Sequence, residues 1–291
     1  MGTDVADLSL NAIVREIDAL TGKPGAVSDL RKATRSFLGW AVSRGLAKFN
    51  PMAGLRLPGK TRAQRLLEAE EKGKALDDCE IVALWCAGQA LQDRAARGEP
   101  VSGSFGAVVQ LALLTGCRRG ELAQLRHDFI LTGDRVIEAR CIKGDRIHLP
   151  ASVTKSASDH HIHLTQMMRR VIEAQPRRLS PLLFPSRMTG GRLSAWDKYV
   201  AALRRDSGVL FQMHDLRRTT RTLMSRLGVA EDIAELAIGH QRADPVGRYN
   251  KDAAWKARTE AFEQVSTHIS ALLAKAADGG NVVPMHGRDQ R

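Results

Sequence analysis

Tyrosine is scarce in this chain: only two of the 291 residues, Tyr199 and Tyr249, are tyrosine. Aromatic residues make up 4% of the sequence, so each one carries more diagnostic weight than usual. Tyr199 lies in the apolar-rich stretch "AWDKYVAAL" and is predicted to pack within a helical core. Tyr249 lies in "GRYNK", among basic and amide side chains where little favours burial. The second tyrosine is therefore a candidate for binding or chemistry.

Cysteine and long apolar runs are also sparse. The four cysteines, at 79, 86, 117 and 141, form no CxxC pair, which favours a reducing compartment over a disulfide framework or a structural zinc site. No apolar run approaches the roughly 18–20 residues needed to span a bilayer. The start "MGTDVADLSL" lacks the basic and apolar regions of a signal peptide. We expect a cytoplasmic protein without a membrane partner.

Acidic residues are outnumbered by basic ones, 32 against 44, which gives a formal net charge of +12. A basic surplus favours a polyanionic partner, because every neutralised phosphate releases condensed counterions. A merely soluble basic surface would give the same balance. The charge therefore favours nucleic acid as a partner without establishing it.

Hydrophobic periodicity predicts a mainly α protein with one short β-rich interval. Residues 1–55 are expected to form a small helical piece, with two apolar stripes at Leu10, Ile13, Ile17, Leu20 and at Leu30, Ala33, Phe37, Ala41. The polar residues 56–75 are typical of a linker. A second domain is predicted over 76–277, and 278–291 are expected to be a flexible tail.

Within the second domain, the patterns predict mostly helices and a small antiparallel sheet. A helix is expected to begin after Asp77 or Asp78, and "SFGAVVQLALLTG" (104–116) is apolar all round, as in a buried central helix. Three short β-branched pieces, at 134–140, 145–150 and 160–165, predict the sheet.

The stretch "TGCRRGEL" (115–122) combines an arginine with a carboxylate that can orient it. Arg118 and Glu121 are three residues apart, so on a helix the carboxylate can hold the guanidinium in a fixed position. Taken alone, this spacing is equally typical of a surface ion pair.

A second basic stretch is "HDLRRTTRTL" (214–223). His214, Arg217 and Arg221 follow at helical intervals and share one face, which can bind an anion near the helix start. A helix that contacts only the DNA backbone would carry the same pattern.

Lysine and histidine follow in the β-rich interval. Lys155 lies between two strand-like pieces, where a lysine is ordinarily just solvated, and Lys143 in "IKGD" is an alternative. We favour Lys155 because "HHIHL" continues as the second strand should. Alternation would put His161 and His163 on one face, as in a metal-binding pair, but no third ligand is evident nearby. No metal site is predicted.

Taken in order, these residues resemble the signature of the tyrosine recombinase (phage integrase) family. That signature is an arginine in T-G-x-R-x-x-E-L, a lysine in a β-hairpin, H-x-L-R, G-H, and a tyrosine some nine residues later. The chain also has "GH" at His240, nine residues before Tyr249. The resemblance covers residues 76–275. "FLGWAVSRGLAKFNPMAGLRLP" is similar to the end of the family's helical core-binding domain, so residues 1–55 are expected to be a partial form of it.

The resemblance implies a site-specific DNA recombinase or integrase that cleaves and rejoins DNA through a 3′-phosphotyrosine. It needs neither metal nor ATP, and no cofactor is expected. The implied catalytic residues are Tyr249, Arg118, Lys155, His214, Arg217 and His240, with Glu121 holding Arg118. The residues expected to contact DNA are Arg31, Lys32, Arg35, Lys48, Arg119, Arg218, Arg221, Arg248 and Lys251.

The implied partner is a double-stranded attachment site on a mobile genetic element, bound by a homo-tetramer with accessory DNA-bending proteins. Two alternatives stay open. One is a non-catalytic DNA-binding accessory factor or decayed integrase on the same scaffold. The other is a type IB topoisomerase-like enzyme that relaxes DNA without exchanging strands.

Overall fold

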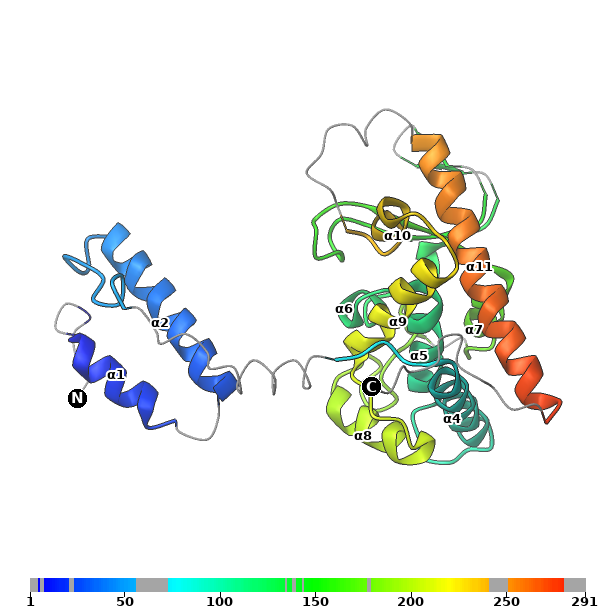
Figure 1. Ribbon diagram of the computed structural model, residues 1–291, viewed down its shortest axis with the longest axis horizontal. Helices are drawn as coiled ribbons and strands as arrows, with labels where there is room; N and C mark the ends of the chain where they lie inside the picture. Colours follow the sequence, from blue (N-terminus) through cyan, green and yellow to red (C-terminus); the bar gives the residue numbers. More distant parts are fainter. Residues whose placement is uncertain are drawn as a thin grey trace, which may run out of the picture. The chain divides into compact units, whose positions relative to one another are not determined.

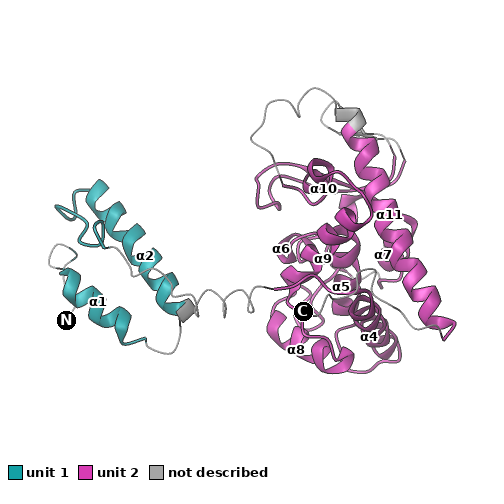
Figure 2. Ribbon diagram, in the orientation of Figure 1, with its two compact units in different colours: residues 1–70 teal, residues 71–291 magenta. Residues whose placement is uncertain are grey.

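The chain divides by its internal contacts into two units, residues 1–70 and 71–291, coloured separately in Figure 2. The computed structural model describes residue 5 and the ranges 8–20, 24–55, 73–133, 135–137, 140–142, 144–176, 179–240 and 251–279. Each unit has its own hydrophobic core and is described separately.

In unit 1, helix α1 (Leu10–Asp18) and helix α2 (Pro24–Ser43) pack against each other. The side chain of Ser9 caps α1 by accepting a hydrogen bond from the Ala12 N–H at 3.2 Å. Ile13 and Ile17 are buried, as the first apolar stripe predicts.

The second predicted stripe is only partly confirmed, because its member Ala41 is buried but Leu30 and Phe37 are exposed, and the buried Leu38 lies outside it. Leu38 and Ala41 are fully buried, whereas Leu30 is 38% and Phe37 46% exposed. Two apolar rows run side by side on this helix, so periodicity alone could not decide which one meets α1. Phe37 instead stacks on the half-exposed ring of Trp40, with 5.9 Å between centroids.

Unit 2 is built around helix α5 (Gly103–Thr115), which contacts α4, α7, α9 and α11 (Figure 1). Every residue of α5 from Phe105 to Thr115 is buried, as its apolar sequence predicts. The other helices are α4 (Asp78–Ala96), α6 (Arg119–Leu122), η2 (His127–Phe129), α7 (Gln166–Glu173), α8 (Trp196–Ser207), α9 (Met213–Arg226), α10 (Glu231–Ala237) and α11 (Lys251–Ala277). Helix α4 begins with a capping box, in which Asp77 accepts from the Glu80 N–H at 2.8 Å and Glu80 accepts from the Asp77 N–H at 3.1 Å.

A buried ion pair network joins three helices of this core. The carboxylate of Asp78, at the start of α4, accepts two bonds of 3.1 Å from Arg226 Nη2 at the end of α9. His268 Nε2 of α11 lies 3.4 Å from the same carboxylate. Helices α4, α9 and α11 are thus joined at the C-terminal end of α9.

The predicted antiparallel sheet is present, with one change in its strands. Its order is β1-β4-β5, with β1 (Ile130–Leu131), β4 (Arg146–Leu149) and β5 (His160–His163). The piece predicted at 134–140 instead forms a separate hairpin, β2 (Arg135–Ile137) with β3 (Arg140–Ile142). The two-residue strand β1 was missed because so short a segment has no readable alternation.

The pairing register of β4 and β5 gives the sheet two different faces. Ile147 pairs with Ile162, and both are buried against the core. The opposite face carries His148 paired with His161, and Arg146 paired with His163. No helix in the described part of the chain is both long and apolar enough to cross a lipid bilayer.

Candidate active site

The stretch with Arg118 begins where the buried helix α5 ends. Gly116 has a left-handed backbone (φ +65°), and a Cβ there would lie 2.9 Å from Ile238 Cγ2 and 3.4 Å from Thr220 Cβ. Glycine is therefore needed both for the turn and for the close packing of the segment before His240.

Glu121 holds Arg118 through both of its oxygens. Oε1 accepts from Arg118 Nη1 at 2.9 Å, and Oε2 accepts from the Arg118 backbone N–H at 2.8 Å. Glu121 is only 2% exposed, so this is a partly buried charge pair. The predicted pairing is confirmed, and it points the guanidinium in a fixed direction.

Arg217 links segments that are far apart in the sequence. Its side chain rises from α9 into the core and is 3% exposed. Nη1 donates to the carbonyl oxygen of Gly116 at 2.7 Å and to that of Ile238 at 2.6 Å. The guanidinium of Arg217 thus holds the turn before Arg118 and the turn before His240 next to each other, because both turns bond to it.

The positive charges of Arg118 and Arg217 favour the binding of an anion between them. Burial, and next the charge of Arg118, lower the pKa of Arg217 from its usual value. Arg217 Nη2 is buried and has no hydrogen-bond partner among the residues that the structure describes. A buried cationic donor without an acceptor is costly, and an anionic oxygen placed between the two guanidiniums would satisfy it.

His214 lies one turn before Arg217 on the same helix, and its side chain is exposed. The ring is nevertheless partly shielded from solvent, and this desolvation, and next the charges of Arg218 and Arg217, lower its pKa. The ring is consequently neutral at neutral pH and can accept a proton. The neighbouring Cys117 is excluded as a nucleophile, because burial raises the pKa of its thiol to about 12.

Glu235 is a site residue that the sequence analysis missed. One of its oxygens accepts from Arg221 Nε at 2.6 Å, and the other is hydrogen-bonded to Nδ1 of His240. Burial alone would raise the pKa of Glu235, but the bonds to Arg221 and His240 outweigh it and keep that pKa below its usual range. The carboxylate therefore orients the imidazole, and only the turn after α10 brings the two together.

His160 supports the same turn from the sheet. Burial lowers its pKa to about 4, so the ring is neutral and its Nε2–H donates to the Ala237 carbonyl at 2.9 Å. Gly239 has φ +79°, and a Cβ there would lie 2.9 Å from His160 Nδ1. The glycine before His240 is required for the turn and for contact with β5.

Lys155 lies in the connection between the paired strands β4 and β5, where its side chain is exposed. The Thr154 hydroxyl donates to the Ser158 carbonyl at 2.7 Å and accepts from the Ser158 N–H at 3.2 Å, which closes the turn around Lys155. The competing Lys143 falls outside the described residues.

Tyr249 and Arg248 also fall outside the described residues, and Lys251 is the first residue of α11. Tyr199, in contrast, stacks on the buried Phe105 with 5.3 Å between ring centroids. Its predicted packing role is confirmed.

The residues expected to contact DNA differ in how far their charges are used within the protein. Arg119, Lys32 and Lys48 are exposed, and Arg218 is paired with Asp215 at 2.9 Å. Arg31 is part-buried and lies 3.7 Å from Asp18. These positions remain predictions.

Two of the residues expected to contact DNA are bonded within the protein. Arg35 donates through Nε and Nη2 to the carbonyl of Met52 and through Nη2 to that of Ala53, at 2.9–3.2 Å, so it closes the turn after α2. Arg221 is held by Glu235 and lies 3.7 Å from Glu231. Helical spacing placed both arginines on helices, as observed. It could not reveal the carbonyl and carboxylate groups that accept their hydrogen bonds, because those groups lie elsewhere in the chain.

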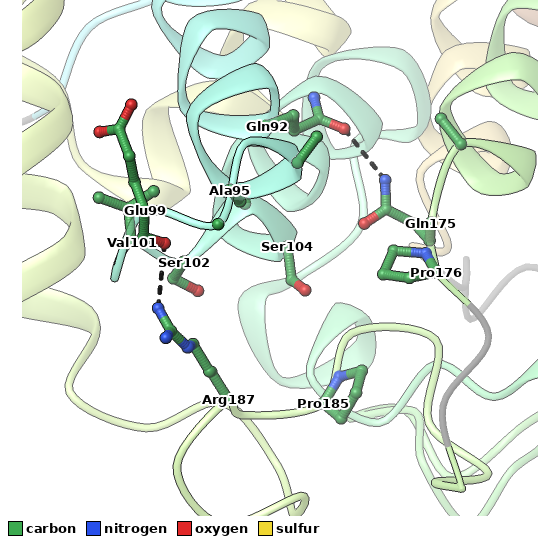
Figure 3. Close-up of a pocket in the computed structure, with 14 residues that line it drawn as sticks. Gln92, Ala95, Glu99, Val101, Ser102, Ser104, Gln175, Pro176, Pro185 and Arg187 are labelled. Atoms are coloured by element: carbon green, nitrogen blue, oxygen red, sulfur yellow. Dashed lines mark hydrogen bonds between the residues drawn. The ribbon is translucent and has the colours of Figure 1, made fainter.

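A cleft of about 470 Å³ lies elsewhere in unit 2, where the end of α4 and the start of α5 meet residues 174–176, Pro185 and Arg187 (Figure 3). Gln175 donates to Gln92 at 3.0 Å, and Arg187 donates to the Glu99 carbonyl at 3.1 Å across it. None of the predicted site residues that the structure describes lines this cleft, so it is not the candidate active site.

Comparison with known proteins assigns the chain to a protein family. Residues 87–255, more than half of the chain, match the model of the phage integrase family. The chain belongs to this family, that of the tyrosine recombinases.

Among the relatives is the tyrosine recombinase XerC of Mycobacterium bovis. It is 27% identical over 248 residues, which cover 82% of this chain and 77% of that protein. A lambda integrase dimer bound to a COC′ core site has a similar structure, with a TM-score of 0.56, 18% identity, and coverage of 82% of this chain and 81% of that one. A lambda integrase tetramer bound to a Holliday junction gives a TM-score of 0.55 at 17% identity, over 82% of this chain and 66% of that one.

Proposed function

We propose that this chain is a site-specific DNA recombinase that cleaves and rejoins DNA through a 3′-phosphotyrosine formed by Tyr249, without ATP or a catalytic metal. One observation carries the proposal. Arg217, bonded to the carbonyls of Gly116 and Ile238, holds the segments of Arg118 and His240 beside its own helix. Three motifs with phosphate-binding side chains therefore meet at one place.

The substrate of this activity is double-stranded DNA that contains an attachment site, and the active form is a homo-tetramer assembled on it. The lambda integrase structures bound to a core site and to a Holliday junction support both points, since they share this fold. The net charge of +12 supports them too. The proposal also includes accessory DNA-bending proteins as partners of the tetramer. It places the reaction on nucleoid DNA in the cytoplasm.

The phosphate is bound between Arg118 and Arg217. The transition state of phosphoryl transfer gathers negative charge on its non-bridging oxygens, and preorganised cations stabilise that charge. Arg118 is fixed by Glu121, and the buried Nη2 of Arg217 needs an acceptor. A phosphate oxygen supplies the acceptor.

Proton transfer requires a base for the tyrosine and an acid for the leaving 5′ oxygen. A phenol with a pKa of about 10 is mostly protonated at neutral pH, so Tyr249 needs a proton acceptor. His214 fills this role, because its lowered pKa keeps it neutral. Lys155, exposed on the β4–β5 connection, supplies the proton to the leaving group, and Lys143 is the alternative acid.

His240 completes the phosphate contacts. Its Nδ1 is bonded to Glu235, so its Nε2 is the atom that can meet a phosphate oxygen. Glu235 and Arg221 therefore act through His240 and are positioning residues.

The two units divide the work between DNA binding and chemistry. Residues 1–55 form a partial core-binding domain, 56–75 a linker, 76–277 the catalytic domain and 278–291 a tail. In the first of these, Arg31, Lys32 and Lys48 contact the DNA backbone.

A suicide DNA substrate tests the proposal. A nicked attachment-site duplex releases a short fragment on cleavage, so the covalent protein–DNA adduct accumulates and is visible on a denaturing gel. Wild type should form the adduct, and Tyr249→Phe should form none. Tyr199→Phe is the matched control and should trap DNA as wild type does, because Tyr199 packs on Phe105.

Other results of the suicide-substrate experiment would indicate one of the alternative functions or another nucleophile. Tight binding without an adduct in wild type indicates a non-catalytic DNA-binding protein. An adduct with relaxation of supercoiled DNA, but no strand exchange between two sites, indicates a topoisomerase-like enzyme. An adduct that persists in Tyr249→Phe contradicts the assignment of the nucleophile.

A further inference from the structure

The outer face of the β4–β5 pair brings together three side chains that metals favour. His148 of β4 and His161 of β5 are direct cross-strand partners, and their rings stack with 4.7 Å between centroids. Asp159 immediately precedes β5, and its Oδ2 lies 3.5 Å from His148 Nε2. One ligand atom from each of the three residues lies within 4.8 Å of the other two.

The ring nitrogens of this cluster are available as ligands. His148 Nε2 and His161 Nδ1 are both buried, and neither has a hydrogen-bond partner among the residues described. Two buried polar atoms without partners in one small cluster call for a ligand, since leaving each unsatisfied costs about 1–3 kcal/mol.

The carboxylate of Asp159 is already oriented toward the two histidine rings. Asp159 Oδ1 accepts from the Ala151 N–H at 2.8 Å, which leaves Oδ2 to face His148. An outer hydrogen bond of this kind is the usual device that fixes a ligating side chain.

We propose that His148, Asp159 and His161 form a binding site for a divalent ion of the zinc class. Imidazole nitrogen and carboxylate oxygen are zinc ligands at about 2.0–2.2 Å, which places the ligand atoms of a tetrahedral site about 3.3 Å apart. The 3.5 Å separation of His148 and Asp159 nearly meets this value. Small side-chain rotations bring in His161, and water takes the fourth position on the half-exposed side of Asp159.

Two arginines near the cluster limit the affinity of this site. Arg146 lies on the same face of β4 as His148, Arg258 lies over the same tryptophan ring as Arg146, and both positive charges would repel a bound cation. Their guanidiniums lie over the ring of Trp255, at 4.3 and 5.1 Å from its centroid. Asp159 supplies the compensating negative charge, so a variant without that charge should bind the ion much less tightly.

The ion would fix the segment that carries Lys155. His148 lies in β4 before the connection 150–159, Asp159 is the last residue of that connection, and His161 lies in β5 after it. A metal ion bound to all three residues would hold the two ends of that connection together. The site shares no residue with the phosphate-binding pair Arg118 and Arg217, and the proposal stands whether or not the chain cleaves DNA.

Metal binding by the full, untagged chain tests the site directly. Metal-stripped protein is dialysed against Zn²⁺, and bound zinc is measured by mass spectrometry. Wild type should bind one ion per chain. His148→Ala and His161→Ala should lose it, and Asp159→Asn should weaken it by at least about tenfold.

His163→Ala is the matched control. His163 lies on the same strand and face as His161, but its Nε2 is bonded to Glu263 at 2.7 Å, so its loss should leave zinc binding unchanged. The absorption spectrum of the Co²⁺ form should lack thiolate charge-transfer bands, which separates this site from the exposed Cys79 and Cys86. Thermal unfolding of each metal-free variant should match that of metal-free wild type.

Limited digestion with trypsin gives a second readout. Cleavage after Lys155 should slow when Zn²⁺ is added to wild type, and should not respond to Zn²⁺ in His148→Ala. The proposal is overturned if wild type binds no more zinc than His148→Ala. It is equally overturned if His163→Ala loses the ion while His148→Ala keeps it, because the ligands would then be the His161 and His163 pair.

Discussion

At the scale of single residues, the candidate site depends on side chains that hold other side chains. Glu121 fixes Arg118, Glu235 fixes His240, and Arg217 fixes two turns through their carbonyl oxygens. Each is a buried or half-buried charge in direct contact with its partner. Preorganisation of this kind lowers the cost of ordering the site when DNA binds.

His214 should set the lower pH limit of cleavage. Its pKa is lowered from the usual value near 6.5, first by burial and then by Arg218 and Arg217. The neutral ring accepts a proton above this pKa, and as pH falls through it the ring becomes charged and the base is lost. Single-turnover cleavage should be constant from about pH 8 to about 6.5 and fall at lower pH.

A variant of His214 provides the control for this profile. His214→Gln should lower the plateau rate by about 10²–10⁴ and remove the fall at low pH, while DNA binding at neutral pH is retained. If the same low-pH fall persists in His214→Gln, another group titrates and the assignment of the base is wrong.

Glu235→Gln should slow cleavage by about tenfold or more. The change removes the negative charge bonded to His240 and Arg221, and a hydrogen bond to a charged group contributes about 1.5–3 kcal/mol. Glu231→Gln is the matched control, since Glu231 is mostly exposed and lies 3.7 Å from the same arginine. The cleavage rate, DNA affinity and melting temperature of both variants are measured. Equal rates for the two would show that Glu235 does not position the histidine.

At the scale of elements, helices α4 and α5 approach so closely that only glycine fits between them. A Cβ on Gly106 would lie 2.1 Å from the Gly88 carbonyl oxygen and 2.9 Å from its carbon. The obstacle is backbone, which cannot rotate aside as a long side chain can. The buried central helix and its capped neighbour are therefore fixed in one relative position.

Gly106→Ala should lower the free energy of unfolding by about 1–3 kcal/mol, because the added methyl forces the two helices apart. Chemical denaturation followed by circular dichroism measures the change. Gly120→Ala is the control: no atom lies within 4 Å of its added Cβ, so its effect should stay within about 0.5 kcal/mol. A tolerated Gly106→Ala would mean that α4 and α5 separate more easily than their packing indicates.

At the scale of the whole molecule, the net charge of +12 should make DNA affinity strongly dependent on salt. A protein that makes about 6–10 phosphate contacts loses about 10³–10⁵ in affinity between 50 and 200 mM salt. Fluorescence anisotropy with a labelled attachment site measures this slope. A flat response would count against a backbone-binding role for the basic residues.

The exposed lysine and the bonded arginine of unit 1 should behave differently in that experiment. Lys48→Ala should reduce the salt slope by about one, because its exposed ammonium is free to meet a phosphate. Arg35→Ala should instead lower the stability of the turn at 52–55, whose carbonyls it binds. If Lys48→Ala leaves the slope unchanged, Lys48 does not contact DNA.

The sequence by itself determined the family, the mainly α fold and the order of the site motifs. It also located the buried helix α5, the start of α4 at Asp77 or Asp78, and the Arg118–Glu121 pair. These features are local: each depends on residues within a few positions of one another, where helical spacing decides which side chains meet.

Only the tertiary structure decided which distant groups share a site. It assigned the buried face of α2 to Leu38 and gave Arg35 its carbonyl partners. It placed Glu235 on His240 and set His148 opposite His161 in the register of β4 and β5. A one-residue shift in that register would move every side chain to the other face, and spacing along the chain carries no information about it. Such contacts depend on how elements pack, and that is settled only when the whole core is formed.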